Sequence, residues 1–383
     1  MTTQRGTPFV LNLRELGGAL GDLGTLLPLM LGTVAVVGLA PMPVLLGFAV
    51  FYIATAFYYR LPIPVQPMKA VAAVLLTAGI TPAGLAASGV MIGAVLLILG
   101  LTGWIGRLAR LVPQSVLAGL QVGLGLALAL VGLDLMATAP LIALATLATF
   151  VGLLFAPRWP SALIGLAVAI VLAQIFGGQG IAFDARPAAF AIPPLPSPAE
   201  VERAVSLFVL PQLSLTFTNA VLLTALIAGD YFGDRAGHVT PVRLSVTSGL
   251  ANLLLTPFGA LPMCHGAGGL AAHYRFGARS GTAPLLLGLV LLAFALMPGG
   301  LGLAALAAIP AAGLGALLLM ASSELALTKR LFDSRPSCWP VIAVTAAVTV
   351  WADPFWGLAA GTGTELVRLA VLRLFARRDR ELS

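Results

Sequence analysis

Long apolar segments separated by short polar breaks fill nearly the whole chain. A helix that spans a bilayer needs about 20 apolar residues, and we read about fourteen such segments on that template. They begin near residues 16, 42, 67, 82, 113, 138, 159, 205, 243, 266, 282, 309, 338 and 354. The segments near 67 and 266 are short. The pattern predicts an all-α polytopic protein that crosses a membrane about fourteen times.

Composition supports lipid as the surrounding solvent. Of 383 residues, 59% are hydrophobic and 9% are charged, which is more apolar surface than one water-soluble core can bury. The formal charge of +7 comes from basic residues scattered between apolar segments, so we expect no nucleic-acid partner. Cys264 and Cys338 lack the spacing of a disulfide framework or a metal site. No short apolar leader with a cleavage site opens the chain, so we expect no removed signal peptide.

The basic residues predict the orientation in the membrane. If the N-terminus is cytoplasmic, the even-numbered connections are cytoplasmic too, and cytoplasmic connections are enriched in Lys and Arg. The basic residues on that predicted inner side are Arg60, Arg107, Arg110, Arg158, Arg235, Arg243, Arg275, Arg279, Lys329, Arg330, Arg335, Arg377, Arg378 and Arg380. Arg186 and Arg203 fall on the other side. We therefore expect cytoplasmic termini and a place in the cytoplasmic (inner) membrane of a bacterium.

The two halves of the chain resemble each other after a shift of about 197 residues. The shift aligns Asp22 with Asn219, Pro64 with Pro262, and Pro113 with Pro310. A repeat with an odd number of spans inserts with opposite topology in its second copy. We predict a first seven-segment repeat at 1–176, a Pro-rich external linker at 177–203, a second inverted repeat at 204–376 and a basic cytoplasmic tail at 377–383.

The short third and tenth segments each follow a run that disfavours helix. Three prolines precede the third, and the sequence allows helix only from about Pro67. A proline and then glycines precede the tenth, so we expect regular helix only from about Leu270. Paired interrupted segments in two inverted halves indicate a transporter's binding site. We predict two half-helices that meet near the membrane midplane.

Two helix N-termini that face one cavity form an anion site, because each presents free N–H groups and partial positive charge. Lys69 begins the first half-helix, and a charged residue at membrane depth is functional by default. Gln66 and the backbone amides after His265 can donate hydrogen bonds to oxyanion oxygens. Gly266, Gly268 and Gly269 allow close approach of the backbone. Packed, kinked helices with a snorkelling lysine are the alternative interpretation.

Ionisable residues inside the segments are candidates for ion coupling. Asp22 and Asn219 occupy equivalent positions in segments predicted to flank the half-helices, and of the two Asp22 is the coupling candidate and Asn219 a candidate substrate-binding residue. A carboxylate beside an anion site repels the substrate, so Asp22 should pair with Lys69 or take up a proton. A capping role for Asp22 is the alternative. Glu324 and Glu365 are weaker coupling candidates that lie within reach of the inner surface, and His238 and His273 read as surface residues.

Other classes of function leave weaker signals. Cys264 beside His265 raises the hypothesis of a nucleophile and base, but adjacent residues rarely have the mutual geometry for it. The glycines after His265 resemble a phosphate-binding loop only loosely, and no nucleotide cofactor is expected. A nucleobase-type symporter needs stacking side chains and a carboxylate at the half-helix start, where this chain has Lys69 and glycines. A passive anion channel is a further alternative.

Several motifs resemble the molybdate transporter family that is related to the SulP sulfate permeases. They are Gly21–Thr25 with Pro28, Pro64–Ala70, Cys264–Leu270 and Tyr274–Arg279. The resemblance implies a fold of fourteen segments split into a core domain, with segments 1–4 and 8–11, and a gate domain. The family-like site positions are Gln66, Met68, Lys69, His265, Gly266, Ala267, Gly268 and Gly269. The chain ends soon after its last segment, so we expect no regulation through the cytosolic C-terminal domain of the larger permeases.

These observations lead to one hypothesis with a close rival. The chain is expected to import molybdate by secondary active transport, with alternating access of a core domain against a gate domain. Sulfate or another tetrahedral oxyanion is the alternative substrate. Helix N-termini and one lysine recognise the charge and shape of an oxyanion and do not distinguish its central atom. By family analogy a homodimer is a further expectation. No metal or cofactor is expected.

Overall fold

The computed structural model describes residues 9–37, 39–78, 80–108, 113–155, 159, 161–177 and 194–382. The first half of the chain forms eight helices and one short strand within those ranges: α1 (Leu13–Val37), α2 (Pro41–Tyr59), β1 (Gln66–Pro67), α3 (Lys69–Ala78), α4 (Pro82–Thr102), α5 (Ile105–Leu108), α6 (Gln114–Ala137), α7 (Pro140–Leu154) and α8 (Ser161–Phe176). Proline opens α2, α4 and α7, where its missing N–H costs nothing because a first-turn amide has no partner inside the helix.

The second half begins with one long helix that continues from Pro198 to Ala236. Its parts are α9 (Pro198–Arg203), a π-helical stretch (Ala204–Val209), α10 (Leu210–Leu215), a second π-helical stretch (Thr216–Leu223), α11 (Thr224–Phe232) and a final turn (Gly233–Ala236). There follow α12 (Pro241–Leu255), β2 (Met263–Cys264), α13 (Ala267–Arg275), α14 (Thr282–Leu296), α15 (Leu301–Ala307), α16 (Ala311–Ala326), α17 (Lys329–Phe332), α18 (Trp339–Trp351) and α19 (Pro354–Leu382).

The long helix begins within the segment predicted as the linker. Ser197 accepts a hydrogen bond from the Glu200 amide, and the Glu200 side chain accepts one from the Ser197 amide, so a capping box starts helix at Pro198. The last residues of the segment predicted as linker, 177–203, are therefore helical. Residues 178–193 of that prediction lie outside the described residues. The predicted basic tail is likewise helical up to Leu382.

The helices fit a membrane-type fold, while the number of crossings stays a prediction. Each predicted segment coincides with a helix or with the long composite helix. By length and composition, four helices in the described ranges can cross a bilayer by themselves, and the bent pair of α14 and α15 adds a fifth. Four shorter apolar helices of the described ranges lie in α7, α8, α16 and α18.

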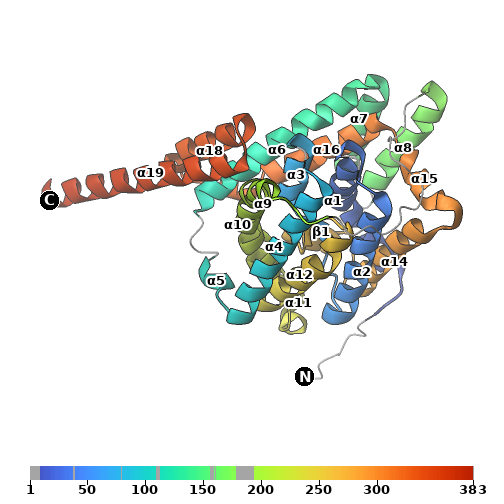
Figure 1. Ribbon diagram of the computed structural model, residues 1–383, viewed down its shortest axis with the longest axis horizontal. Coiled ribbons are helices and arrows are strands. Elements are labelled where there is room, and N and C mark those ends of the chain that lie inside the picture. The colour runs from blue at the N-terminus through green and yellow to red at the C-terminus, as the bar shows by residue number, and fades with distance from the viewer. Residues whose placement is uncertain are drawn as a thin grey trace.

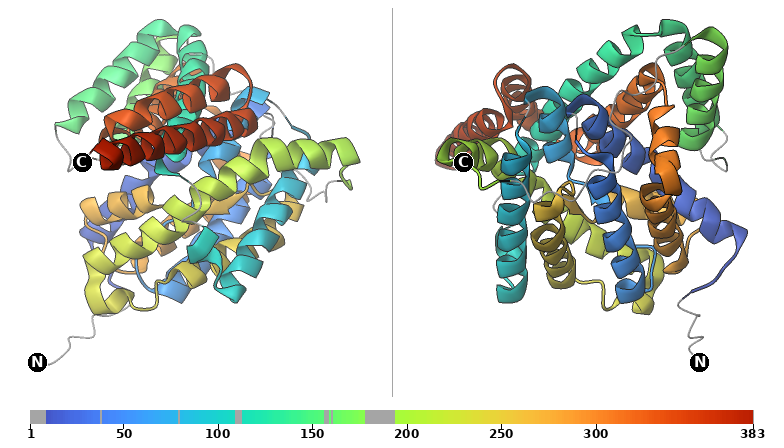
Figure 2. Two further views of the ribbon diagram at one scale, coloured as in Figure 1. Left: turned by 90° about the vertical axis from the view of Figure 1, so that its left-hand side faces the viewer. Right: turned by 45° about the vertical axis from the view of Figure 1, so that its right-hand side comes forward.

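The helices pack as two groups (Figures 1 and 2). In one group α1 packs on α3, α13 and α14, while α2 packs on α14 and α4 on α12. In the other, α6 packs on α16, α18 and α19, and α7 packs on α8 and α16. Figure 1 shows the second group above the first, with the end of α19 reaching away from the body. The groups meet where α1 contacts α16 and α3 contacts α6.

Small residues bring helices of one group close together. A Cβ added to Gly93 of α4 would lie 2.9 Å from the carbonyl oxygen of Gly249 in α12. On α6, Gly119 and Gly123 face Thr345 and Thr349 of α18 in the same way. Helices in lipid associate through such close backbone packing, because no hydrophobic force drives one apolar helix onto another there.

Candidate substrate-binding site

The two interrupted segments cross as a short antiparallel pair of strands. Gln66 pairs with Cys264 and Pro67 with Met263. The Asn252 side chain on α12 fixes the second strand, because it donates to the Met263 carbonyl oxygen at 2.6 Å and accepts from the Met263 amide at 2.9 Å. The crossing places the starts of α3 and α13 on either side of one small space.

Helix starts at slightly different positions from those predicted. α3 begins at Lys69 rather than near Pro67, since β1 holds Pro67 in extended conformation. α13 begins at Ala267, three residues before the predicted Leu270. Glycine is tolerated at the start of a helix because the first amides have no partner inside it. Gly266 is the N-cap of α13 in extended conformation, and no side chain caps this end.

The N-terminus of α3, by contrast, is capped by Gln212 of α10. Its Oε1 accepts from the amides of Ala70 at 2.9 Å and Val71 at 3.3 Å. Its Nε2 donates to Oγ1 of Thr216 at 2.8 Å. Neither residue is among the predicted site residues. Gln212, Thr216 and Asn219 recur at helical spacing in an otherwise apolar helix, and that periodicity is the signal that could have found them.

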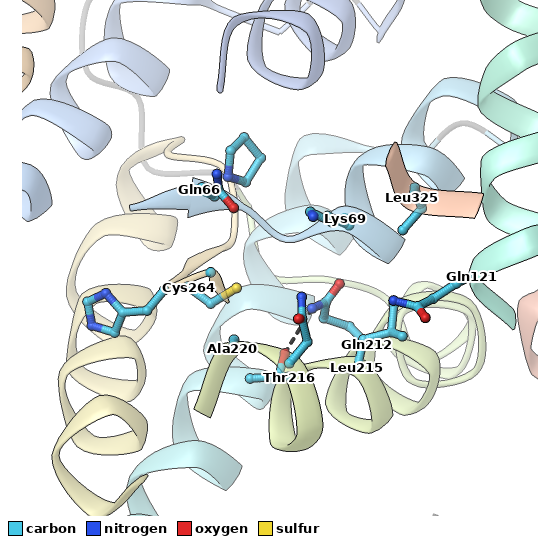
Figure 3. A pocket seen from close by; sticks show the side chains of 13 residues that line it. Gln66, Lys69, Gln121, Gln212, Leu215, Thr216, Ala220, Cys264 and Leu325 are labelled. Atoms are coloured by element: carbon cyan, nitrogen blue, oxygen red, sulfur yellow. Dashed lines mark hydrogen bonds between the residues drawn. The ribbon is translucent and has the colours of Figure 1, made fainter. Parts of the chain in front are cut away.

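A cavity of about 20 Å³ lies between the half-helices (Figure 3). Its polar wall includes Gln66, Lys69, Gln121, Gln212, Thr216 and Asn219. A second cavity of about 950 Å³ shares Lys69, Gln121, Asn219 and Leu325 with it. The larger cavity extends to Arg330, Arg335 and Arg368. The small space therefore adjoins a wide vestibule, which Asp230 and Asp333 also line.

Lys69 provides the positive charge of this site. Its half-buried side chain lines both cavities. Nζ lies 3.9 Å from the position that a Cβ on Gly268 would take, so the ammonium group lies beside the first turn of α13. Among the described residues, no carboxylate lies within ion-pair distance of it. The ammonium group and the uncapped end of α13 together favour an anion.

Two of the glycines are required by close packing. A Cβ on Gly266 would overlap the Gln66 side chain, and one on Gly269 would lie 2.6 Å from Oδ1 of Asp22. Gly268 is exposed and lines the larger cavity together with Ala267. These glycines thus serve different purposes, since the first two allow the strand crossing and Gly268 opens the helix end toward the cavity.

Two predicted site residues do not present their side chains to the cavities. Met68 is fully buried, and its amide donates to the Pro262 carbonyl oxygen at 3.0 Å. Nδ1 of His265 lies 2.9 Å from the Pro64 carbonyl oxygen and Nε2 lies 2.8 Å from Oγ1 of Thr247. A carbonyl only accepts, so Nδ1 donates and Nε2 accepts from the hydroxyl. The imidazole holds the two crossing segments together. His265 still forms part of the wall of the small cavity.

Asp22 does not pair with Lys69. It is fully buried and accepts from the Tyr52 hydroxyl and from Nε2 of Gln66, each at 2.7 Å. Gln66 is the residue that joins it to the cavity wall. The prediction that His273 is a surface residue is wrong. Its side chain is fully buried, and Nε2 lies 3.5 Å from Oδ2 of Asp22.

The weaker coupling candidates differ in what the structure shows. Glu365 is 5% exposed and accepts from Arg368 at 2.6 and 2.9 Å and from the Ser115 hydroxyl at 2.8 Å. Ser115 and Arg368 line the larger cavity, so this ion pair lies at its wall. Glu324 belongs to α16, but its side chain lies outside the described part of the structure.

Sequence comparison decides the family. The model of a family described as "Molybdate transporter of MFS superfamily" matches residues 14–128 and 204–325. The chain belongs to the molybdate transporter family. It is 33% identical to Molybdate transporter 2 of Arabidopsis thaliana, over 94% of this chain and 87% of that protein. It is 29% identical to Molybdate transporter 1 of Chlamydomonas reinhardtii, over 82% of this chain and 83% of that protein.

Solved anion transporters share the fold of this molybdate transporter family member. The transmembrane domain of a cyanobacterial bicarbonate transporter, BicA, matches with a TM-score of 0.68 at 17% identity, over 91% of this chain and 97% of that domain. Murine Solute Carrier 26 family member A9, an anion transporter in the inward-facing state, gives a TM-score of 0.68 at 17% identity, over 97% of this chain and 69% of that chain. Membership of the molybdate transporter family makes the chain an integral membrane transporter and not a Cys264–His265 enzyme.

Proposed function

We propose that this protein imports molybdate across the membrane as a secondary active transporter. Two features support the substrate. The relatives named above are molybdate transporters, and the site offers positive charge without an aromatic platform. Molybdate is a tetrahedral dianion, which suits hydrogen-bond donors that converge from several directions. Sulfate has the same charge and shape and is the alternative substrate of the same site.

The observation that carries the proposal is the position of Lys69 beside the uncapped N-terminus of α13. A helix N-terminus stabilises an anion by about 0.3–2 kcal/mol, and each hydrogen bond to a charged group contributes about 1.5–3 kcal/mol. Free amides at the first turn of α13 and one ammonium group thus favour a bound anion without burying a second charge. We place the oxyanion between Lys69 and Gly268, with Gln66 and Asn219 in contact through the small cavity.

We infer that the two helix groups move against each other during transport. The site lies between them, because Lys69 and Gly268 belong to one group and Gln121 of α6 to the other. The larger cavity runs from the site to Arg330, Arg335 and Arg368. If the basic end is cytoplasmic, as the positive-inside rule predicts, this conformation is open to the inside. Movement of the core group would close that path and open one to the other side.

The finer architecture is part of the same proposal. We assign fourteen segments to two inverted seven-segment repeats at 1–176 and 204–376, with both termini in the cytoplasm of a bacterium. In support, β1 and β2 are paired antiparallel, and each precedes a short helix that starts at the site. Such paired discontinuous helices are typical of inverted-repeat transporters.

Ion coupling is assigned to Asp22 rather than to the two glutamates. Asp22 touches Gln66 of the cavity wall, whereas Glu365 is held by Arg368. A carboxylate that is next to the anion site and can take up a proton relieves repulsion with the substrate. A passive channel needs no such group, and trans-stimulation of uptake by internal molybdate would separate the carrier from the channel.

Uptake of labelled molybdate into proteoliposomes tests the proposed function. We expect saturable uptake that a hundredfold excess of sulfate does not abolish, and protein-free liposomes are the control. Full competition by sulfate would reassign the substrate while keeping the fold and the site. No uptake of either oxyanion under an inward proton gradient would contradict the proposal.

A further inference from the structure

A buried aspartate and a buried histidine face each other behind the binding site. Asp22 of α1 and His273 of α13 are both fully buried, and Oδ2 of Asp22 lies 3.5 Å from Nε2 of His273. The residues are far apart in sequence, and the packing of α1 on α13 brings them together. A surface ion pair contributes little energy. In a buried pair, an uncompensated charge costs several kcal/mol, so the charges of the two groups must offset each other.

The hydrogen-bond partners fix how many protons the pair holds. Nδ1 of His273 lies 2.8 Å from the Gly18 carbonyl oxygen, so Nδ1 must carry a hydrogen because a carbonyl only accepts. If Nε2 were bare and Asp22 ionised, a nitrogen lone pair would point at a carboxylate oxygen inside a medium of low dielectric. In the described structure Nε2 has no hydrogen-bond partner. One proton on the pair, either on Nε2 or on the carboxyl group, removes this repulsion, and loss of that proton restores it.

The pair is linked to the binding site through one side chain. Gln66 donates from Nε2 to Oδ1 of Asp22 at 2.7 Å and lines the small cavity. A Cβ on Gly269 would touch both Gln66 and Asp22. The first turn of α13 therefore lies against the carboxyl group, while the last turn of the same helix carries His273.

Few other charged groups reach the pair. Tyr52 of α2 donates to Oδ2 of Asp22 at 2.7 Å. Nζ of Lys69 on α3 lies 3.9 Å from the position that a Cβ on Gly268 would take, and it forms no ion pair with Asp22. Glu15, earlier on α1, accepts from the Arg279 amide at 2.8 Å. The remaining charged residues on packed elements are Arg14 on α1, Arg275 on α13 and Asp230 on α11, all exposed, and Glu324 on α16, whose side chain is outside the described part. Among these described groups, only Tyr52 contacts the carboxyl group of Asp22 directly.

We propose that Asp22 and His273 together form the proton site of the transporter, and that the proton and the oxyanion favour each other's binding. The inference rests on the proposed function and adds His273 to it. With its proton the pair is neutral overall, and without it the pair carries one negative charge next to a site for a dianion. Binding of the oxyanion should therefore draw a proton onto the pair, and by linkage a bound proton raises oxyanion affinity by the same factor. That coupling is symport.

Titration calorimetry with molybdate tests the proposal on the purified, full-length protein. The binding enthalpy is measured in buffers of different ionisation enthalpy between about pH 5 and about pH 8. We expect a buffer-dependent enthalpy that reports uptake of a fraction of one proton, and an affinity that falls on the order of tenfold as pH rises. Binding with the same enthalpy in every buffer at every pH would overturn the proton site and leave the oxyanion site intact. No binding of any oxyanion would instead contradict the proposed function.

Two variants assign the proton to this pair. Asp22→Asn and His273→Gln each keep a polar side chain of similar size and should abolish the buffer dependence while molybdate still binds. His238→Gln is the matched control, because His238 lies outside the cavities and bonds to the Tyr59 carbonyl oxygen. Proton uptake that persists at the wild-type level in either folded variant would overturn the assignment. Since the wild-type measurement needs no variant, misfolding of one variant leaves the test intact.

Discussion

We propose that Lys69 contributes the positive charge at the site, and its removal tests this role. We expect Lys69→Gln to lower molybdate affinity by about a hundredfold, because it removes a charge-assisted contact of about 1.5–3 kcal/mol from a water-poor space. Calorimetry or scintillation proximity binding would measure the loss.

A matched variant separates a local effect from general loss of charge. Arg107→Gln removes a positive charge from α5, where the guanidinium lies over the Trp104 ring, and it should bind molybdate normally. Equal affinity of Lys69→Gln and the unmodified protein would contradict the placement of the site.

Gln212 tests whether the end of α3 faces the anion. Its carbonyl oxygen occupies the amides of Ala70 and Val71. Gln212→Glu keeps the shape but places a carboxylate on these amides, so we expect oxyanion binding to fall at least tenfold through charge repulsion. Gln174→Glu is the control, because Gln174 on α8 is exposed and lines neither cavity. Unchanged binding by Gln212→Glu would show that α3 takes no part.

Part of the residue-level site follows from the sequence and part does not. Lys69, Gln66 and Gly268 were accessible because prolines and glycines mark the interrupted segments. The burial of His273 is not predictable from the sequence, because it depends on the packing of α1 against α13 from the opposite half of the chain. The brace formed by His265 has the same origin, because its partners Pro64 and Thr247 are distant in sequence.

At the scale of elements, the start of α13 is fixed by glycines with different tolerances. Gly269→Ala would place a Cβ against Asp22, Gln66 and Pro64, and overpacking of this kind costs about 1–3 kcal/mol. We expect a clearly lower Tm in detergent. Gly268→Ala meets only Nζ of Lys69, at 3.9 Å, so its Tm should stay near that of the unmodified protein while molybdate affinity falls. Equal Tm values for the two variants would contradict the described packing.

Helix positions were predictable where local chemistry decides them. Proline at the first turn marks α2, α4 and α7, and the apolar runs mark the helix bodies. The start of α9 was missed because the Ser197–Glu200 capping box lies in a stretch that reads as linker by composition. The start of α13 was placed late because glycine was weighed as a helix breaker, although it is acceptable at the first turn.

At the scale of the whole molecule, the larger cavity predicts which side is open. In a background with Cys264→Ala and Cys338→Ala, a cysteine at Ser334 should react with a membrane-impermeant thiol reagent from the cytoplasmic side, because Ser334 lines that cavity. Cys264→Ala should also retain uptake, since the thiol has no catalytic role. Labelling of the Ser334→Cys variant only from the external side would reverse the proposed orientation.

The global arrangement was the least accessible from sequence. Apolar segments identify helices, but in lipid nearly every helix face is apolar, so the pattern does not say which helices pack together. The grouping of α6 with α16, α18 and α19 appears only in the structure. The cavity between the groups depends on that arrangement, so the sequence does not predict it either.

The most direct test of the account is the position of bound molybdate. Molybdenum scatters X-rays anomalously, so crystals soaked in molybdate and measured at its absorption edge would locate the ion. The account predicts a peak between the N-termini of α3 and α13, within contact of Lys69 and the Gly268 amide. A peak only elsewhere, with this space empty at saturating molybdate, would contradict it.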